Sequence, residues 1–124
     1  MSISCLIVDD NADFLEAAKA ALERQGMPAV AVATTAHDGL RRAGELDPDV
    51  ILVDIDLGQE SGFELTRRLA GAAGPAGPRV VLISAHSGDD FADLVAESPA
   101  VGFLAKSDLS TNAIRRLVSG SPGR

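Results

Sequence analysis

Short runs of apolar residues alternate with longer segments of helical spacing along the chain, and this alternation repeats about five times. We expect strands at the apolar runs, over residues 4–8, 29–33, 50–53, 79–83 and 101–105. The intervening segments repeat apolar positions three and four residues apart and predict helices over residues 12–25, 36–46, 62–72, 89–97 and 111–118. The third strand is apolar on both faces, which is typical of a parallel sheet covered by helices on each side.

The ends of the expected helices carry residues that favour a change of chain direction. Gly26 follows the first helix, Asp47-Pro48 follows the second, and Ser110 is placed to be the N-cap of the last. Alternating strands and helices imply right-handed crossovers and a parallel sheet. We therefore predict a doubly wound, flavodoxin-like α/β fold with strand order 2-1-3-4-5. We expect a single domain over residues 1–124, with its core at about 3–118 and a frayed tail at 119–124.

Polar residues follow four of the five expected strands. In open α/β sheets, ligand sites form at the carboxyl ends of the strands, where the strand order reverses, and here this point lies between the first and third strands. The residues at these ends are Asp9 and Asp10 on the first strand, Asp54 on the third, Ser84 on the fourth and Lys106 on the fifth. We expect all five to meet at one edge of the sheet.

Three carboxylates within a few ångströms repel one another, so this edge is expected to bind a cation. Mg²⁺ fits, because it takes oxygen ligands and usually keeps several waters beside one or two carboxylates. We predict Asp10 and Asp54 as direct ligands, Asp9 acting mainly through a bound water, and the backbone carbonyl of Asp56 as a further ligand. Lys106 is a compact cation suited to holding a carboxylate or phosphoryl oxygen. One such residue alone would more often be a cap or a solvated charge, so the prediction depends on their combination.

Composition narrows the classes of function. The chain has 124 residues, 46% of them hydrophobic, with four Phe and neither Trp nor Tyr, which indicates one core built from aliphatic side chains. A net charge of −7 disfavours direct binding to nucleic acid or to an anionic membrane. The single cysteine, Cys5, cannot form an internal disulfide and is expected to be buried. Because no signal peptide and no apolar run of ~20 residues is evident, we expect a cytoplasmic protein.

Taken together, these residues resemble the receiver domain of two-component response regulators, a CheY-like family, over essentially the whole chain. The motifs that carry the resemblance are Ile7-Val8-Asp9-Asp10, Val53-Asp54-Ile55-Asp56-Leu57 with Gly62 eight positions after Asp54, Ile83-Ser84-Ala85, and Gly102-Phe103-Leu104-Ala105-Lys106. The resemblance implies that Asp54 receives a phosphoryl group from a sensor histidine kinase, a phosphotransfer protein or a small phosphodonor. Mg²⁺ and Lys106 would take up charge on the phosphoryl oxygens, and we expect Asp54 to be the carboxylate nearest both cations and to stay ionised.

The resemblance also implies a conformational switch. The Ser84 hydroxyl would move toward the phosphoryl oxygen, and Phe103 would turn inward behind it. This change would repack the face of the fourth helix, fifth strand and fifth helix, where a downstream effector or a second phosphorylated copy of the chain would bind. An ordinary core aromatic accounts for Phe103 equally well.

Some positions depart from the commonest form of the family pattern. Gly58 stands where Pro is frequent, which predicts a more flexible loop, and the switch residue is Ser84 rather than Thr. Asp56 and His86, two residues beyond Asp54 and Ser84, flank the direction from which water would attack an acyl phosphate. We hypothesise that they tune the lifetime of the phosphorylated form.

Two other functions remain open from the sequence. Asp54-Ile55-Asp56 is similar to the nucleophile motif of haloacid-dehalogenase-type phosphatases, although that motif normally ends the first strand, and Gly58 stands where Thr or Val usually follows. The second is an interaction module that is not phosphorylated, which the complete set of site residues argues against. We expect a switch rather than a turnover enzyme. Only one helix and a short tail follow Lys106, so we expect the output to belong to a partner or to the rest of a longer regulator.

Overall fold

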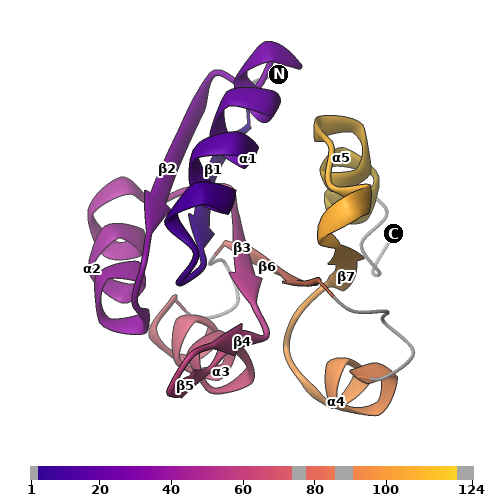
Figure 1. The fold of residues 1–124 in the computed structure, drawn as a ribbon. Helices are drawn as coiled ribbons and strands as arrows, with labels where there is room; N and C mark the ends of the chain where they lie inside the picture. Colours follow the sequence, from indigo (N-terminus) through magenta and orange to yellow (C-terminus); the bar gives the residue numbers. More distant parts are fainter. Residues whose placement is uncertain (1–2, 74–77, 86–90, 120–124) are drawn as a thin grey trace.

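The computed structural model describes residues 3–73, 78–85 and 91–119 and is built around a five-stranded parallel sheet (Figure 1). Its strands are β1 (Ser4–Val8), β2 (Ala29–Ala33), β3 (Val50–Asp54), β6 (Arg79–Ser84) and β7 (Gly102–Ala105). They are ordered β2-β1-β3-β6-β7. Because β6 and β7 are the fourth and fifth strands of this sheet along the chain, the predicted order 2-1-3-4-5 is confirmed.

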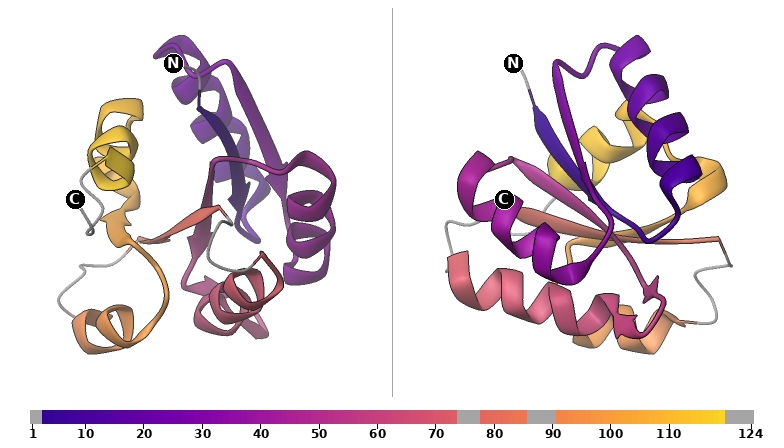
Figure 2. Two further views of the ribbon diagram at one scale, coloured as in Figure 1. Left: turned by 180° about the vertical axis from the view of Figure 1, so that it is seen from behind. Right: turned by 60° about the vertical axis from the view of Figure 1, so that its left-hand side comes forward.

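Helices cover both faces of the sheet (Figures 1 and 2). They are α1 (Ala12–Arg24), α2 (Ala36–Leu46), α3 (Gly62–Ala73), α4 (Ala92–Glu97) and α5 (Thr111–Ser119), with a 3₁₀ turn, η2, at Lys106–Asp108. The strands point alternate side chains to opposite faces, so two cores form. Ile7 of β1 packs in the core beneath α1 and α5, whereas Leu6 and Val8 pack in the core beneath α2, α3 and α4.

The helix ends agree with the sequence signals. Ser110 caps α5, since its Oγ accepts the Ala113 N–H at 3.0 Å. Asn11 caps α1 in the same manner, its Oδ1 accepting the Phe14 N–H at 3.1 Å. Gly26, just after α1, has φ +95°, a conformation in which a side chain would be strained.

The structure differs from the expected elements in two places. Residues 56–61, expected as a loop, form a small antiparallel hairpin of β4 (Asp56–Leu57) and β5 (Glu60–Ser61), which is too short to produce an apolar pattern. Helix α4 begins at Ala92, while residues 86–90 lie outside the described residues. Leu94, an apolar residue of this helix, is 49% exposed.

Two predictions from composition can be compared with the structure. Cys5 is buried in the core beneath α1 and α5, as expected, and burial raises the pKa of its thiol to about 12, which makes it unreactive. Among the described residues, every helix is too short or too polar to cross a membrane.

Candidate functional site

The register of the sheet brings the predicted site residues to one edge. Val8 of β1 pairs with Val53 of β3, so the next residue of each strand, Asp9 and Asp54, follows at the same level. On the other side of β3, Asp54 pairs with Ile83. Ser84 of β6 pairs with Ala105 of β7, which places Lys106 directly beyond the end of β7. The parallel arrangement therefore brings the ends of these four strands, and the residues at them, to one edge of the sheet.

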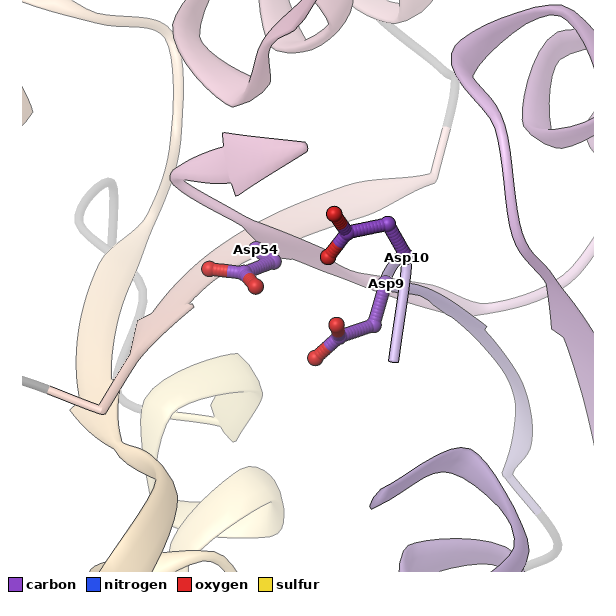
Figure 3. A group of neighbouring side chains, drawn as sticks. All are labelled: Asp9, Asp10 and Asp54. Atoms are coloured by element: carbon purple, nitrogen blue, oxygen red, sulfur yellow. The ribbon is translucent and has the colours of Figure 1, made fainter. Parts of the chain in front are cut away.

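Three carboxylates form an acidic cluster at this edge, defined here as Asp9, Asp10 and Asp54 (Figure 3). Each offers one oxygen that lies within 4.8 Å of the others. Asp9 is completely buried, Asp54 is 6% exposed, and Asp10 is exposed. Two inner carboxylates and one outer carboxylate make a site that opens to solvent on the side of Asp10.

Lys106 supplies the positive charge beside this cluster. Its Nζ lies 2.6 Å from Asp9 Oδ2 and 3.3 Å from Asp54 Oδ2, and its side chain is mostly buried. The expectation that Asp54 is the carboxylate nearest this lysine is therefore wrong in this structure. Asp9 is the more deeply buried of the two carboxylates. The deeper a carboxylate is buried, the more its charged form depends on a neighbouring cation for stabilisation.

The pKa of Asp54 reflects this environment. The pKa of Asp54 is raised from an ordinary 3.8 to about 6, mainly because the carboxyl group is buried. The negative charge of Asp9 raises this pKa further. The hydrogen bond from the Asp56 N–H and the positive charge of Lys106 lower it. Without a bound cation, Asp54 therefore takes up a proton more readily than an ordinary aspartate, whereas the expectation that it stays ionised applies to the site with a bound cation. Burial alone would lower the pKa of Lys106, but its contacts with Asp9 and Asp54 raise it overall, so the lysine stays charged.

The acidic cluster has the donor set of a site for a hard divalent cation. All three ligand atoms are carboxylate oxygens, which such ions prefer to nitrogen or sulfur. The Lys106 ammonium lies 2.6 Å from Asp9 and 3.3 Å from Asp54, so one positive charge faces a cluster of three carboxylates. The negative charge that remains favours a bound cation. The residues present therefore fit a metal ion.

The chain after Asp54 is folded back by local hydrogen bonds. The Asp56 N–H donates to Asp54 Oδ1 at 3.1 Å, and Asp56 Oδ1 accepts the Gly58 N–H at 3.1 Å. Gly58 has φ +77° and lies so close to Asp10 that an added Cβ would be 3.1 Å from its Oδ2. Glycine therefore suits this position both by its backbone conformation and by the narrow space beside the acidic cluster.

The β4–β5 hairpin is tied to α2 by a contact that the sequence did not reveal. Glu60 of β5 accepts the Ala36 N–H, at the first turn of α2, at 3.1 Å. Thr35 caps the same helix by accepting the Asp38 N–H at 3.0 Å. Helix N-termini leave backbone N–H groups unpaired, and a carboxylate there is favourable. No pattern within the hairpin predicts this contact, because its partner lies 24 residues away.

Gly62, the glycine eight positions after Asp54 in the sequence, packs against the backbone of Asp54. A side chain at Gly62 would overlap the Asp54 carbonyl oxygen, and the Gly62 N–H donates to the Ile55 carbonyl at 2.8 Å. This position therefore admits only glycine without moving Asp54. The close approach explains why a glycine stands at this spacing.

The remaining predicted residues are distributed around the acidic cluster. Ser84 is buried at the end of β6. Phe103 is partly buried and packs against the core beneath α2, α3 and α4, on the side of α4. Asp56 is exposed. His86 lies outside the described residues.

Comparison with known proteins agrees with the resemblance to response regulator receiver domains. The sequence profile of the family described as "Response regulator receiver domain" matches residues 5–118. The chain is 29% identical over 124 residues to the transcriptional regulatory protein LiaR of Bacillus subtilis, covering 97% of this chain and 58% of LiaR. This chain thus spans little more than half the length of that relative.

Two solved structures are similar in both fold and sequence. One is a LuxR-family two-component response regulator from Aurantimonas sp., with TM-score 0.85 and 27% identity, over 98% of this chain and 88% of that one. The other is a response regulator from Burkholderia pseudomallei with a phosphorylated aspartic acid, a calcium ion and citrate. Its TM-score is 0.79 at 27% identity, over 94% of this chain and 66% of that one.

Proposed function

This chain belongs to the response regulator receiver domain family, and we propose on that basis that it is switched by phosphorylation of Asp54 in a Mg²⁺-dependent reaction. The observation that carries the proposal is the acidic cluster with the Lys106 ammonium in contact with both Asp9 and Asp54. Response regulators receive phosphoryl groups from histidine kinases and act on effector domains, which makes this receiver domain a signalling switch.

In the proposed reaction, a carboxylate oxygen of Asp54 attacks the phosphorus of a phosphohistidine or of a small acyl phosphate. The bond from phosphorus to the donor breaks, the donor leaves with that electron pair, and an acyl phosphate forms on Asp54. Hydrolysis later reverses the modification, as water attacks phosphorus and Asp54 leaves as a carboxylate. Lys106 lies where its ammonium can follow the added negative charge from the carboxylate to a phosphoryl oxygen.

Asp10, Asp54 and the backbone carbonyl of Asp56 would hold Mg²⁺, with Asp9 acting mainly through a bound water. The bound ion would neutralise charge on the phosphoryl oxygens as they approach the cluster. The related Burkholderia protein has both a phosphorylated aspartic acid and a calcium ion, and Ca²⁺, like Mg²⁺, takes oxygen ligands.

The test is to treat the protein and an Asp54→Asn variant with acetyl phosphate and Mg²⁺ and to weigh both by intact mass. We expect one phosphoryl adduct on the parent and none on the variant. Chelation of divalent ions with EDTA should suppress the adduct on the parent. An adduct on the variant, or a parent that stays unmodified, would reject Asp54 as the acceptor.

We further propose that Asp56 and His86 tune the lifetime of the acyl phosphate. Asp56 is tied into the turn after the acceptor, so its substitution would change both the local backbone and the approach of water. The rate of phosphate loss from the phosphorylated protein, measured for single Asp56→Ala and His86→Ala variants, tests each residue. Unchanged rates in both variants would remove the proposal.

The proposed output surface is formed by α4, β7 and α5. Ser84 at the end of β6 and Phe103 on β7 would connect the phosphoryl group to it, as Ser84 moves toward the phosphoryl oxygen and Phe103 turns inward. The exposed Leu94 lies on α4 within this face. We propose that an effector domain or protein, or a second phosphorylated copy of the chain, binds there, and that the protein works in the cytoplasm with a sensor histidine kinase or phosphotransfer protein.

No observation favours the phosphatase alternative. Asp54 ends β3, the third strand along the chain, which lies between β1 and β6 in the sheet. The interaction-module alternative predicts an incomplete site, whereas the described acidic cluster and Lys106 come together at contact distances.

A further inference from the structure

Lys106 has a third neighbour besides its two carboxylates. The ring of Phe14, in the first turn of α1, lies with its centroid 4.3 Å from Lys106 Nζ. This distance is within the range of a cation–π interaction, in which an ammonium is attracted to the negative face of an aromatic ring. An ammonium has three N–H donors, and here it has three neighbours: Asp9, Asp54 and this ring.

The position of the ring is set by a closed series of contacts. Asp9 Oδ1 accepts the Asn11 N–H at 2.9 Å, and Asn11 Oδ1 accepts the Phe14 N–H at 3.1 Å. Phe14 then covers Lys106, whose Nζ lies 2.6 Å from the other oxygen of Asp9. The start of α1 is thereby tied to the same carboxylate that holds the lysine.

Ordinary packing explains only part of this arrangement. Phe14 is half-buried and contacts the core beneath α1 and α5, which an aliphatic side chain of similar size would also do. Phe14, Lys106 and Leu109 together line an open pocket of about 180 Å³ between α1 and the turn after β7. Lys106 lines this open pocket, and an aromatic ring beside it combines a water-excluding surface with attraction for the ammonium.

We propose that Phe14 is a positioning residue for Lys106: its ring holds the ammonium between Asp9 and Asp54, ready to meet the incoming phosphoryl group. This inference deepens the proposed function and depends on it for its kinetic consequence. Phe14 acts through Lys106 and does not touch the reacting atoms.

The experiment compares Phe14→Leu with Phe14→Tyr in the full chain. Leu keeps apolar bulk and removes the ring face, while Tyr keeps the ring. With acetyl phosphate and Mg²⁺, followed by intact mass, we expect adduct formation to slow by roughly 3- to 10-fold in the Leu variant and to stay within about twofold of the parent in the Tyr variant. A Leu109→Ala variant, which changes another residue that lines the same pocket and keeps the Phe14 ring, is the matched control and should keep the rate of the parent.

A spectroscopic measurement separates this inference from the proposed function. The ε-methylene protons of Lys106 should show an upfield ring-current shift in the NMR spectrum of the parent and of Phe14→Tyr, and should lose it in Phe14→Leu. This holds whether or not Asp54 is phosphorylated. A Leu variant that reacts at the parental rate, Leu and Tyr variants that are equally slow, or a parental spectrum without the shift would each overturn the positioning role.

Discussion

At the scale of single residues, the proposed phosphoryl acceptor, Asp54, has neighbours with opposite effects on its pKa. Asp54 is buried next to the charge of Asp9, and both effects favour its protonated form, while the Asp56 N–H and Lys106 favour the carboxylate. The outcome is a pKa of about 6 in the metal-free protein. A bound divalent cation would shift this balance toward the carboxylate, which is the form that can attack phosphorus.

This pKa leads to a prediction about stability and pH. Between pH 4 and 6 the folded protein keeps a proton on Asp54 that the unfolded chain has lost, so this residue makes the metal-free protein less stable as pH rises through that window. Asp54→Asn removes the effect. We expect the variant to gain stability relative to the parent from pH 4 to pH 7, by up to about 2–3 kcal/mol.

Thermal unfolding of both proteins in EDTA across this pH range is the measurement. Added Mg²⁺ is the control: it should stabilise the parent at pH 7 and have less effect on Asp54→Asn. A difference between the two proteins that stays constant from pH 4 to pH 7 would contradict the raised pKa.

At the scale of elements, α3 can begin directly against β3 because its first residue, Gly62, has no side chain. Gly62 lies against the Asp54 carbonyl at the end of β3, and its N–H donates to Ile55. Thr66, one turn later, is buried and donates its hydroxyl to the Gly62 carbonyl at 2.8 Å. The start of α3 therefore packs directly against the end of β3.

We predict that Gly62→Ala destabilises the protein by at least about 2 kcal/mol, because the added methyl group overlaps the Asp54 backbone and β3 or α3 must move. Gly71→Ala, in the same helix, is the matched control. A Cβ at Gly71 would meet no atom within 4 Å, and alanine should stabilise the helix by up to ~1 kcal/mol. Urea unfolding of the two variants measures both effects. Equal stability changes would show that Gly62 is retained for another reason.

At the scale of the whole molecule, the sheet connects the acidic cluster to a surface far along the chain. β1 and β3 carry Asp9 and Asp54, and β6 and β7 continue the same sheet to Ser84 and Phe103. The central strand β3 is buried at every position, whereas β7 and α4 are only partly covered. A charge added at Asp54 would therefore change the covered, rigid side of the sheet least and the β7–α4 side most.

Hydrogen exchange should show this pattern. On binding beryllofluoride and Mg²⁺, which mimic the phosphoryl group, we expect altered exchange in peptides covering Phe103 and α4, and little change in β1 and β3. Asp54→Asn under the same conditions is the control and should show no difference. Changes confined to residues beside the acidic cluster would mean that the proposed output surface does not respond.

The sequence by itself determined the order of the five parallel strands and five helices, and the edge of the sheet where the site lies. These features follow from local rules: the period of apolar positions, the right-handed crossover and the polar residues at strand ends. The spacing of Asp9, Asp54 and Lys106 along the chain, combined with the strand order, is enough to predict that these three residues are neighbours.

The tertiary structure alone decided how these neighbours divide their contacts. Lys106 lies nearer Asp9 than Asp54, and the Phe14 ring covers its ammonium. Both contacts depend on differences of an ångström or less in the positions of elements that are distant in sequence. The contact of Glu60 with α2 and the β4–β5 hairpin also lie outside sequence reasoning. Residue types report which groups can attract each other, but packing decides which pairs meet, because each charge in a buried site has more candidate partners than it can contact.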